Sequence, residues 1–578
     1  MEVLLLMLLT FGGYIAAYHL YGKFLSRKIF KINPESTVPS HNLKDGVDFV
    51  PSKKKVVFGH HFTSIAGTGP IVGPAVAIIW GWLPALIWVF LGSIFMGAVH
   101  DFGSLVISLR NQGKSISDYT AKYMHKHTRF LFFLVVFLEL WIVIAIFGLV
   151  IAIIFNIFPA SVFPVFMQIA IAVWLGRMVN IKGRNINIYT AIAVVLMFAT
   201  IIAGVYIPFK MPEIAGIPAT GIWTIILLIY AFIASILPVA TLLQPRDYIN
   251  AYQLIVVMLL LVGGVIVTSF STDLHLVAPS VNIDPKGAPN LFPFLFITIA
   301  CGAISGFHSV VSSGTSAKQL DNEKDALFVG YGSMLMEGTL ALLVLIAVAA
   351  GIGLGYKTGD QTLTGISAWN SHYASWQAVS GLGSKLNAFV VGSSNMIETL
   401  GVPYQWALAI MGVFIASFAG TTLDTATRLQ RYVISEVFTG VKPMQNKWLA
   451  TFIAVFTAAI LAFANGANGN GALSLWPLFG AVNQTLAALA LIVITLYLKK
   501  KGKFYWMVSG LPAVFMSVMT VWALVANEGD FWGDKNWLLV VVNFLVIAIA
   551  SIITLEGLGL FIMPSRKIKT KKISEPSV

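Results

Sequence analysis

The segment His60–Trp80, which reads HHFTSIAGTGPIVGPAVAIIW, limits most strongly how this chain can fold. It is apolar and has the length of a membrane span, yet its middle is interrupted by glycine and proline: Gly67, Gly69, Pro70, Gly73 and Pro74. Proline removes a backbone donor and blocks the preceding turn, and glycine weakens a helix. Because unpaired backbone groups are costly in lipid, a broken helix persists there only when it is buried in protein or lines a cavity.

Two interpretations of this interruption are open. In secondary transporters, the freed amides of a second half-helix hold an anion, and freed carbonyls hold a cation or a proton donor. The alternative is a kinked, glycine-packed span without a ligand, since both residue types are common in membrane helices. The candidate substrate-binding residues of this segment are Gly67, Thr68, Gly69, Pro70 and Gly73.

Composition places the chain in a membrane. Of its 578 residues, 57% are hydrophobic and 11% are charged, whereas soluble proteins carry about 25% charged residues. We therefore predict an all-α polytopic membrane protein surrounded by lipids. The net charge of +13 does not indicate nucleic acid, because the basic residues cluster in short loops between apolar segments. Cys301 is the only cysteine, which excludes an intramolecular disulfide.

Hydropathy and loop charge together predict a topology. About fifteen transmembrane helices are expected, with the N-terminus outside and the C-terminus, including the basic tail Arg566–Lys572, in the cytoplasm of a bacterial inner membrane. The first helix lacks the basic start and the cleavage site of a signal peptide, so it should be retained. Three parts are predicted: a first helix and basic loop over 1–58, a transporter core over 59–435 with an external or re-entrant segment at 357–402, and C-terminal helices over 436–578.

The order of the predicted spans contains a further pattern. The ten spans from His60 to Thr427 divide into two sets of five that start from opposite sides of the membrane. Inverted repeats of this kind occur in transporters whose sets each begin with a broken helix. The second set is expected to begin at Gly221, with Pro238 as its break.

The segment Cys301–Leu320 is unusually polar for a membrane span. Five of its residues recur at three- and four-residue spacing and so share one helix face: Ser305, His308, Ser309, Ser312 and Ser316. Such a face could bind a carboxylate or hold a small cation, or it could pack against a neighbouring helix with His308 hydrogen-bonded to it. The residues predicted to face the substrate are Ser305, His308, Ser312 and Ser313.

Ionisable residues inside apolar spans are the candidates for coupling. Glu139 lies about ten residues inside its span, near the bilayer midplane, where a carboxyl group favours its protonated form and could carry a proton. Its alternative is a neutral carboxyl group bonded to a neighbour. Asp101 with His100 is the second proton-coupling candidate, although Asp101 could simply pair with His100 or Arg110.

Two further ionisable features are given structural interpretations. Asp424 and Arg428 are four residues apart and could form a local salt bridge. His60 and His61 are expected at the membrane boundary.

No zinc-protease HExxH motif is present, and Ser108 stands where a nucleotide-binding loop ending at Gly113-Lys114-Ser115 needs its first glycine. We therefore expect no enzyme activity, no cofactor and no metal site.

At these residues the chain resembles the carbon starvation protein A family. The segments that carry the resemblance are GHHFTSIAGTGPIVGPAVA (Gly59–Ala77), GAVHDFGS (Gly97–Ser104), SGFHSVVSSGTSAKQL (Ser305–Leu320), GYGSMLMEG (Gly330–Gly338) and GTTLDTATRLQRY (Gly420–Tyr432). The resemblance implies an inner-membrane carrier of the amino acid–polyamine–cation superfamily with a LeuT-type core. It also implies proton-coupled import of peptides or pyruvate in nutrient-limited bacteria.

The combined prediction is a secondary active symporter with alternating access that imports a small carboxylate together with a proton. Pyruvate is the leading substrate and short peptides are the alternative. Sodium coupling would make Ser312 and Ser313 cation ligands instead. A passive channel and a membrane-embedded nutrient sensor are the alternatives of other classes, and neither of them needs a broken helix.

Overall fold

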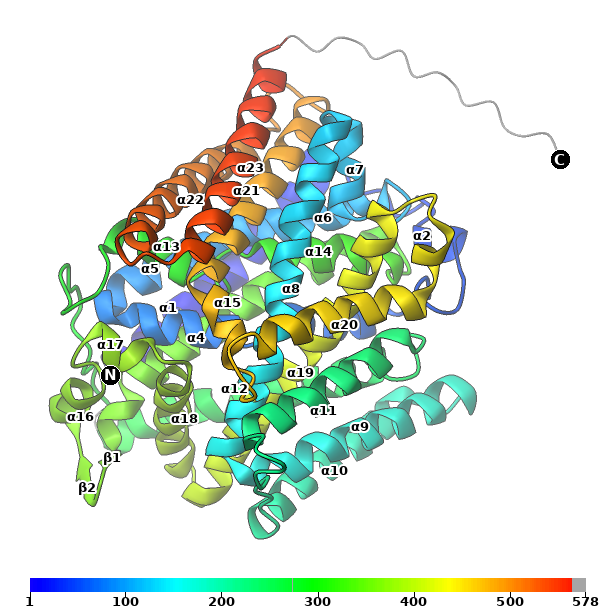
Figure 1. Cartoon of the computed structure of the whole chain (residues 1–578). Coiled ribbons are helices and arrows are strands. Elements are labelled where there is room, and N and C mark those ends of the chain that lie inside the picture. The colour runs from blue at the N-terminus through cyan, green and yellow to red at the C-terminus, as the bar shows by residue number, and fades with distance from the viewer. Residues whose placement is uncertain (273, 564–578) are drawn as a thin grey trace.

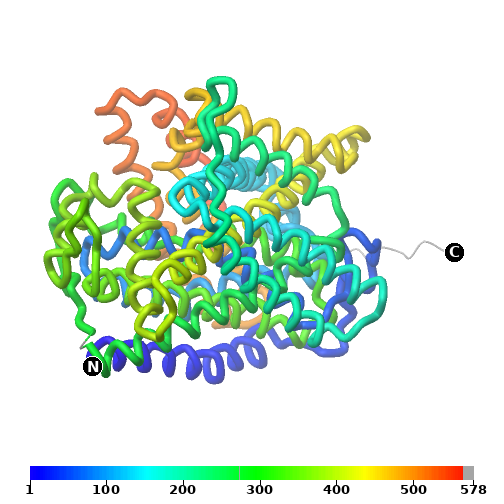
Figure 2. Tube along the Cα trace, turned by 90° about the horizontal axis from the view of Figure 1, so that it is seen from below, coloured from blue at the N-terminus to red at the C-terminus, as the bar shows by residue number. Residues whose placement is uncertain are grey.

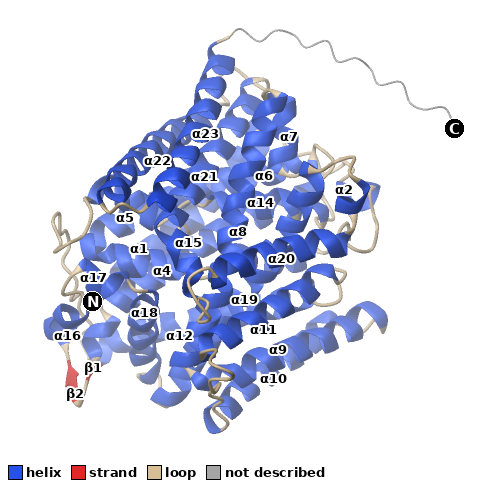
Figure 3. Ribbon diagram, viewed as in Figure 1, coloured by secondary structure: helices blue, strands red, loops and turns tan. Residues whose placement is uncertain are grey.

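The computed structural model describes residues 1–272 and 274–563, so the predicted basic tail Arg566–Lys572 lies outside the described residues. Most of the described chain is helical (Figure 3). Its one sheet is a hairpin of β1 (Tyr356–Thr358) and β2 (Gln361–Leu363), which pair antiparallel. The all-α prediction is therefore confirmed for this part of the chain.

Twelve helical segments of the described chain are long and apolar enough to cross a membrane, and one bent pair could add a thirteenth. The twelve are Glu2–Ile29, Trp82–Leu109, Lys126–Ile157, Pro159–Ile181, Ile186–Tyr206, Ala219–Ile236, Leu243–Ser271, Glu323–Leu354, Tyr404–Val437, Asn470–Lys499, Met507–Gly533 and Trp537–Ile562. Two other predicted crossings take shorter forms: Leu291–Ala317 contains two short helices, and α20 (Lys447–Phe463) has 17 residues. The total of fifteen crossings stays a prediction.

The predicted interruption of the first broken segment is confirmed. Helix α3 (Lys54–Ile65) ends at Ile65, and α4 (Gly69–Ala77) starts four residues later at an angle of 43°. Pro70 stands in the first turn of α4, where its missing donor removes no helical hydrogen bond. The glycines and prolines therefore place the break between residues 65 and 69.

A second broken segment lies elsewhere than the sequence indicated. Pro238 does not interrupt a span, because it lies in the turn between α11 (Ala219–Ile236) and α12 (Leu243–Ser271). The break instead separates α13 (Leu291–Thr298) from α14 (Gly306–Gly314). Within it, Gly302 has φ +90°, a left-handed conformation that glycine adopts without steric cost.

The two breaks lie against each other. A Cβ on Gly73 of α4 would stand 2.6 Å from the carbonyl oxygen of Thr298, which ends α13. Only glycine allows the two backbones to approach this closely. Backbone that has lost its helical hydrogen bonds is thus gathered in one buried place, as the cost of unpaired groups in lipid requires.

Two long helices pass beside the breaks and pack along each other: α8 (Lys126–Ile157) and α19 (Tyr404–Val437). Helices α11 and α20 pack together next to them. At the lower right of Figure 1, α9 (Val162–Gly176) and α10 (Ile186–Tyr206) form a peripheral pair. At the upper left, α21 (Trp476–Lys499) contacts both α22 (Met507–Gly533) and α23 (Trp537–Ile562).

The remaining elements frame this bundle. Helix α1 (Glu2–Ala17) runs along one edge of the molecule (Figure 2) and contacts α15 (Gly332–Ala349). The span Trp82–Leu109 contains α5 (Trp82–Gly92) and α6 (Ala98–Leu109), and α7 (Ile116–Tyr123) follows it. The short helices near the hairpin are α16 (Gly365–His372), α17 (Trp376–Ser380) and α18 (Leu382–Glu398), while α2 (Pro39–Asn42) lies in the basic loop.

Candidate functional site

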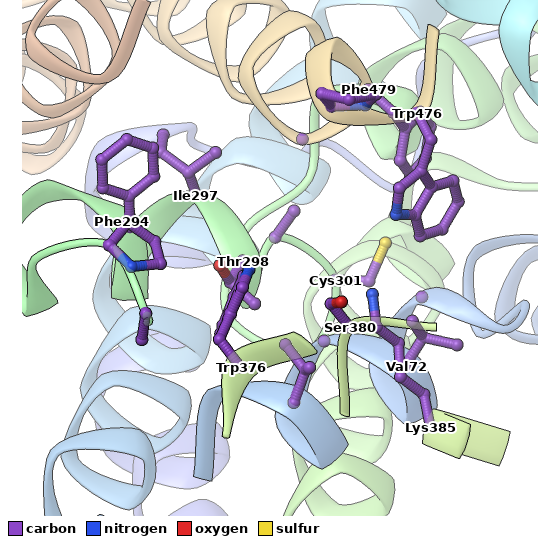
Figure 4. A pocket seen from close by; sticks show the side chains of 18 of the residues that line it. Val72, Phe294, Ile297, Thr298, Cys301, Trp376, Ser380, Lys385, Trp476 and Phe479 are labelled. Carbon is purple, nitrogen blue, oxygen red and sulfur yellow. The ribbon is translucent and has the colours of Figure 1, made fainter. Parts of the chain in front are cut away.

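A cavity of about 650 Å³ opens beside the two breaks. Thr68, Gly69 and Gly73 line it from the first broken segment, and Thr298 and Cys301 line it from the second. Figure 4 shows Val72, Thr298 and Cys301 around the same space. The cavity therefore lies where the freed backbone groups of both segments are concentrated.

Short helices and aromatic rings complete its wall. Trp376 of α17, Lys385 of α18 and Trp476 of α21 all line the cavity (Figure 4). The Tyr373 hydroxyl, just before α17, donates a hydrogen bond to the carbonyl of Ala75 in α4. The mouth includes Asp530, which is exposed. The predicted external or re-entrant segment 357–402 thus supplies one wall of the cavity.

Lys385 is the buried cation of this cavity. Its side chain is 6% exposed and extends into the space in Figure 4, with Nζ 5.2 Å from the ring centroid of Trp476. No carboxylate among the described residues forms an ion pair with it. Because burial disfavours the charged form, the pKa of Lys385 is lowered to about 8. A protonated amine held without a counter-charge is suited to bind an anion.

The two half-helices that begin at the breaks differ at their N-termini. Helix α14 is capped from outside, because Oδ1 of Asn483 accepts hydrogen bonds from the Phe307 amide at 2.9 Å and from the Ser305 hydroxyl at 3.1 Å. Helix α4 has no side-chain cap, and its first residue, Gly69, lines the cavity. The positive end of α4 is thus the one available to a ligand.

The structure separates the predicted substrate residues into two groups. Thr68, Gly69 and Gly73 line the cavity, whereas Gly67 faces Thr422 and Pro70 lies near Gly302. The predicted residues of the second segment, which are Ser305, His308, Ser312 and Ser313, are buried and are not among the residues that line the cavity. The Ser313 hydroxyl donates to the Ser309 carbonyl and accepts from the Ile116 amide.

Behind Cys301, a fully buried cluster joins three helices. The Asp101 carboxylate of α6 accepts hydrogen bonds from Nδ1 of His100, at 2.8 Å, and from Nδ1 of His308, at 3.0 Å. Nε2 of His308 lies 3.3 Å from Oε2 of Glu337 in α15. The expected contact of Asp101 with His100 is therefore present, and the alternative pairing with Arg110 is wrong, since Arg110 pairs with Glu323.

Glu139 lies apart from both the cavity and this cluster. It is fully buried on α8, and neither carboxylate oxygen has a hydrogen-bond partner. Phe147, eight residues further along α8, lines the cavity, which places Glu139 about 12 Å away by helical rise. The alternative of a carboxyl group bonded to a neighbour is not what the structure shows.

The opposite ends of the broken segments are closed by polar contacts. His60 and His61, which are expected at the membrane boundary, are both fully buried within the protein. His60 contacts Asp247 at 2.6 Å and Thr315 at 2.9 Å, and His61 contacts Ser316 at 2.8 Å. Their buried partners lie on α12 and after α14, and sequence spacing does not reveal these contacts.

The expected salt bridge between Asp424 and Arg428 is also wrong. Asp424 pairs with Arg246 of α12 and accepts a hydrogen bond from Tyr230. Arg428 and Arg431 instead pair with Asp48 of the basic loop, at 2.7 and 3.0 Å. We call the contacts of Asp48 with Arg428 and Arg431 the clamp.

Electrostatics and backbone contacts hold the clamp closed. Burial alone would raise the pKa of Asp48, but Arg431 and Arg428 outweigh it and hold the pKa at about 2. The Ser52 amide donates to the Gln319 carbonyl at 2.9 Å, and Ser52 forms a parallel bridge with Leu320. The basic loop is therefore fixed against the end of the second broken segment.

Sequence reasoning missed Lys385 and the partner of His308. Lys385 begins an apolar stretch in a segment predicted to be external or re-entrant, and a lysine followed by apolar residues was the available signal. Glu337 is visible as an acid within an apolar span, but nothing in the sequence pairs it with His308. Both relations depend on which helices pack together.

Comparison with known proteins identifies the family. The profile described as "Carbon starvation protein CstA" matches residues 2–523. The chain belongs to this family. It is 34% identical to the "Peptide transporter CstA" of Campylobacter jejuni over 88% of this chain and 78% of that protein. It is 32% identical to the "Pyruvate/proton symporter BtsT" of Escherichia coli over 88% of this chain and 80% of that protein.

The solved structures extend the similarity to the fold. A mutant of the manganese transporter of Eremococcus coleocola matches 90% of this chain and 99% of its own, with a TM-score of 0.53 and 10% identity. At this identity the likeness concerns the fold alone. Named members of the carbon starvation family are transporters and not enzymes, and this chain is a multi-span membrane transporter of that family.

Proposed function

We propose that this protein is a secondary active importer of a small carboxylate, most simply pyruvate, driven by protons. The observation that carries the proposal is a buried cation beside an uncapped helix start: Lys385 and the N-terminus of α4 line one cavity. The ammonium group supplies charge and the Gly69 amide at the start of α4 supplies a hydrogen-bond donor, which together match a carboxylate, while the next amides of α4, those of Ile71 and Val72, donate to the Thr68 carbonyl.

The charge distribution of the cavity favours a monocarboxylate over a zwitterion. Its two charged lining residues are Lys385, which is buried, and Asp530, which is exposed at the mouth. A peptide amine bound deep in the cavity would need a carboxylate there, and Glu337 and Asp101 are engaged with His308 behind the wall. Thr68 and Ser380 offer hydroxyl groups that suit the keto oxygen of pyruvate.

Short peptides remain the second candidate because of the size of the cavity and its aromatic wall. A volume of about 650 Å³ is in the range that holds drug-sized ligands, and it exceeds what pyruvate fills. Trp376 and Trp476 could pack against peptide side chains. In that case Lys385 would hold the C-terminal carboxylate and Asp530 the amine at the mouth.

Proton coupling is assigned first to Glu139 and second to Asp101 with His100. Glu139 is buried without a hydrogen-bond partner on a helix that also lines the cavity. A carboxyl group in that setting binds a proton strongly until the surrounding helices let water reach it. Sodium coupling would instead use Ser312, whose hydroxyl has no partner, and Ser313.

The packing also supports an inverted repeat, in a different register from the sequence prediction. The first set would be α3–α4, α5–α6, α8, α11 and α12, and the second α13–α14, α15, α19, α20 and α21. Equivalent members pack together, as α8 does with α19 and α11 with α20. The ten-helix core would then extend to Lys499, with α9–α10 as an added pair, and the total would be fifteen crossings.

From the basic residues in the loops, we also propose that the clamp side faces the cytoplasm, with the N-terminus outside and the C-terminus inside. A cysteine introduced at Ser280 in a Cys301→Ala background should react with an impermeant thiol reagent in intact cells, and one at Ser52 should not. The reverse pattern would overturn this orientation.

The test of the substrate uses purified protein in proteoliposomes. Labelled pyruvate and labelled dipeptides are offered separately under an imposed inward proton gradient, an imposed sodium gradient, or neither. Accumulation of pyruvate above equilibrium that needs the proton gradient supports the proposal. Accumulation of dipeptides alone selects the second candidate, and flux that no gradient can concentrate means a passive channel.

The test of coupling uses Glu139→Gln, which keeps the shape of the side chain but cannot release a proton. The variant should lose proton-driven accumulation and keep the exchange of labelled for unlabelled substrate, because exchange needs no net proton movement. Accumulation that survives would exclude Glu139, and the same test then moves to Asp101→Asn.

A further inference from the structure

The cluster behind the cavity wall contains three different metal-ligand types. Cys301 Sγ, His308 Nε2 and a carboxylate oxygen of Glu337 lie within 4.8 Å of one another, and all three residues are buried. They come from the second break, from α14 and from α15. Thiolate, imidazole and carboxylate are a ligand set typical of zinc and neighbouring divalent transition metals.

Two of the three ligand atoms have no hydrogen-bond partner. Nε2 of His308 and Oε2 of Glu337 are both buried, and among the described residues they face each other as an ion pair without meeting the geometry of a hydrogen bond. They lie 3.3 Å apart, while two such ligands on a tetrahedral zinc ion would stand about 3.4 Å apart, given bond lengths of about 2.0–2.2 Å. Their spacing already matches a shared metal ion.

Neighbouring groups hold both ligands in the required orientation. The Asp101 carboxylate accepts a hydrogen bond from Nδ1 of His308 at 3.0 Å, so Nε2 is the ring nitrogen that faces Glu337 and can bind a metal ion in place of a proton. The Gly302 amide donates to Oε1 of Glu337 at 3.1 Å, which leaves Oε2 free. A carboxylate behind a metal-bound histidine is a recurrent outer-shell arrangement.

The charge and the access route also fit. A Cys301 thiolate and a Glu337 carboxylate balance the two charges of the ion, so that a buried divalent cation is neutralised. Cys301 itself lines the cavity, which gives an ion a path to the cluster and leaves a fourth coordination position for water on that side.

We propose that Cys301, His308 and Glu337 form a binding site for a divalent transition-metal ion of the zinc class, with Asp101 as the residue that positions His308. Binding releases to solvent the thiol proton of Cys301 and the proton between His308 Nε2 and Glu337, and it forms metal–sulfur, metal–nitrogen and metal–oxygen bonds without any change of oxidation state. Because the ion joins the second break to α15, it should also hold the two together and inhibit uptake.

The test measures cobalt binding to purified, tag-free protein without substrate, so it is independent of the pyruvate proposal. Since Cys301 is the only cysteine, a thiolate-to-cobalt absorption band in the near ultraviolet can report no other site. We expect this band to saturate at one equivalent, to disappear on addition of Zn²⁺, and to be absent in Cys301→Ser. Asp101→Asn should weaken cobalt binding by about 10- to 100-fold.

His127→Gln provides the matched control, because His127 and His125 lie beside Glu556 on the surface and could bind metal adventitiously. This variant should leave the absorption band unchanged. Absence of the band from wild-type protein in excess cobalt would overturn the proposal, even if a cluster variant failed to fold. Tight cobalt binding that persists in Cys301→Ser would overturn it as well.

Discussion

The two ends of the broken segments differ in whether their buried charged side chains form ion pairs. On the cavity side, the buried cation Lys385 lies beside aromatic rings and forms no ion pair with a carboxylate of the described residues. On the clamp side, the buried arginines are paired with carboxylates: Arg428 and Arg431 with Asp48, and Arg246 with Asp424. One side is prepared for an incoming anion, and the other is closed on itself.

This difference indicates how access alternates. Opening the clamp would leave Arg428, which is fully buried, without its partner, and breaking a buried ion pair costs several kcal/mol. Binding of a carboxylate at Lys385 would remove the corresponding charge imbalance on the cavity side. In the proposed transport cycle, substrate binding would thus stabilise closure of the cavity, and that closure would favour opening of the clamp.

The largest expected effect comes from filling the uncapped helix start. Gly69→Val should abolish uptake, because even a Cβ at this position would overlap the sulfur and the β-carbon of Cys301. Uptake is measured in cells with the amount of membrane protein quantified in parallel. Gly12→Val is the control, since a Cβ there meets nothing within 4 Å. Normal uptake by Gly69→Val would mean that the first break serves helix packing and does not bind the substrate.

The second prediction removes the charge from the cavity side. Lys385→Met should raise the Kd for pyruvate by about 100-fold or more, since the carboxylate would lose its buried cation. Lys385→Arg should stay within about tenfold of wild type, and Lys357→Met, an exposed lysine on β1, should bind normally. These Kd values are measured by equilibrium binding of labelled pyruvate to the purified proteins. An unchanged Kd in Lys385→Met would remove Lys385 from the site.

The third prediction loosens the clamp. Asp48→Asn should increase the rate at which a thiol reagent modifies a cysteine at Ser52, in a Cys301→Ala background, by about tenfold. The estimate allows for the partial exposure of Asp48, which weakens its ion pairs. Asp321→Asn is the matched control, because its pair with His41 is half exposed. Equal labelling of both variants would mean that the clamp does not control access.

The smallest effect concerns pH. Carboxylate binding needs the protonated amine of Lys385, whose pKa is about 8 before substrate binds. Affinity should therefore be constant below about pH 7, and the Kd should rise about fourfold between pH 7 and pH 8.5 as the amine loses its proton. Direct binding avoids the separate effect of pH on coupling. Lys385→Arg should show no such rise, and a rise of equal size in that variant would assign the effect elsewhere.

Structural features that depend on the residues of one short segment could be predicted from the sequence. Glycine and proline in His60–Trp80 predict the first break because their effects on a helix are local. The second break could not be found in this way, since residues 299–305, IACGAIS, include no proline and only one glycine. Its disrupted backbone depends on neighbours, among them Glu337, which bonds the Gly302 amide, and Asn483, which caps α14.

The candidate site residues likewise divide into those that could be predicted from a local segment and those that depend on helix packing. Thr68, Gly69 and Gly73 were identified from sequence and do line the cavity. Lys385 was not, because its role follows from the packing of α18 against α4. The ion pairs of Asp48 and Asp424 join residues more than 170 positions apart, so local spacing suggested the wrong partner for Asp424.

The cap that Asn483 forms on α14 bears on how much charge the proposed transport cycle moves across the membrane. By occupying the N-terminus of α14 with its own carbonyl oxygen, it leaves one helix start for an anion. With one carboxylate and one proton moved in each proposed cycle, no net charge crosses the membrane. A membrane voltage contributes about 2.3 kcal/mol per charge for each 100 mV, so it would add nothing to such a cycle. Uptake would then follow the pH difference alone, and a cell could accumulate pyruvate even when its membrane is depolarised.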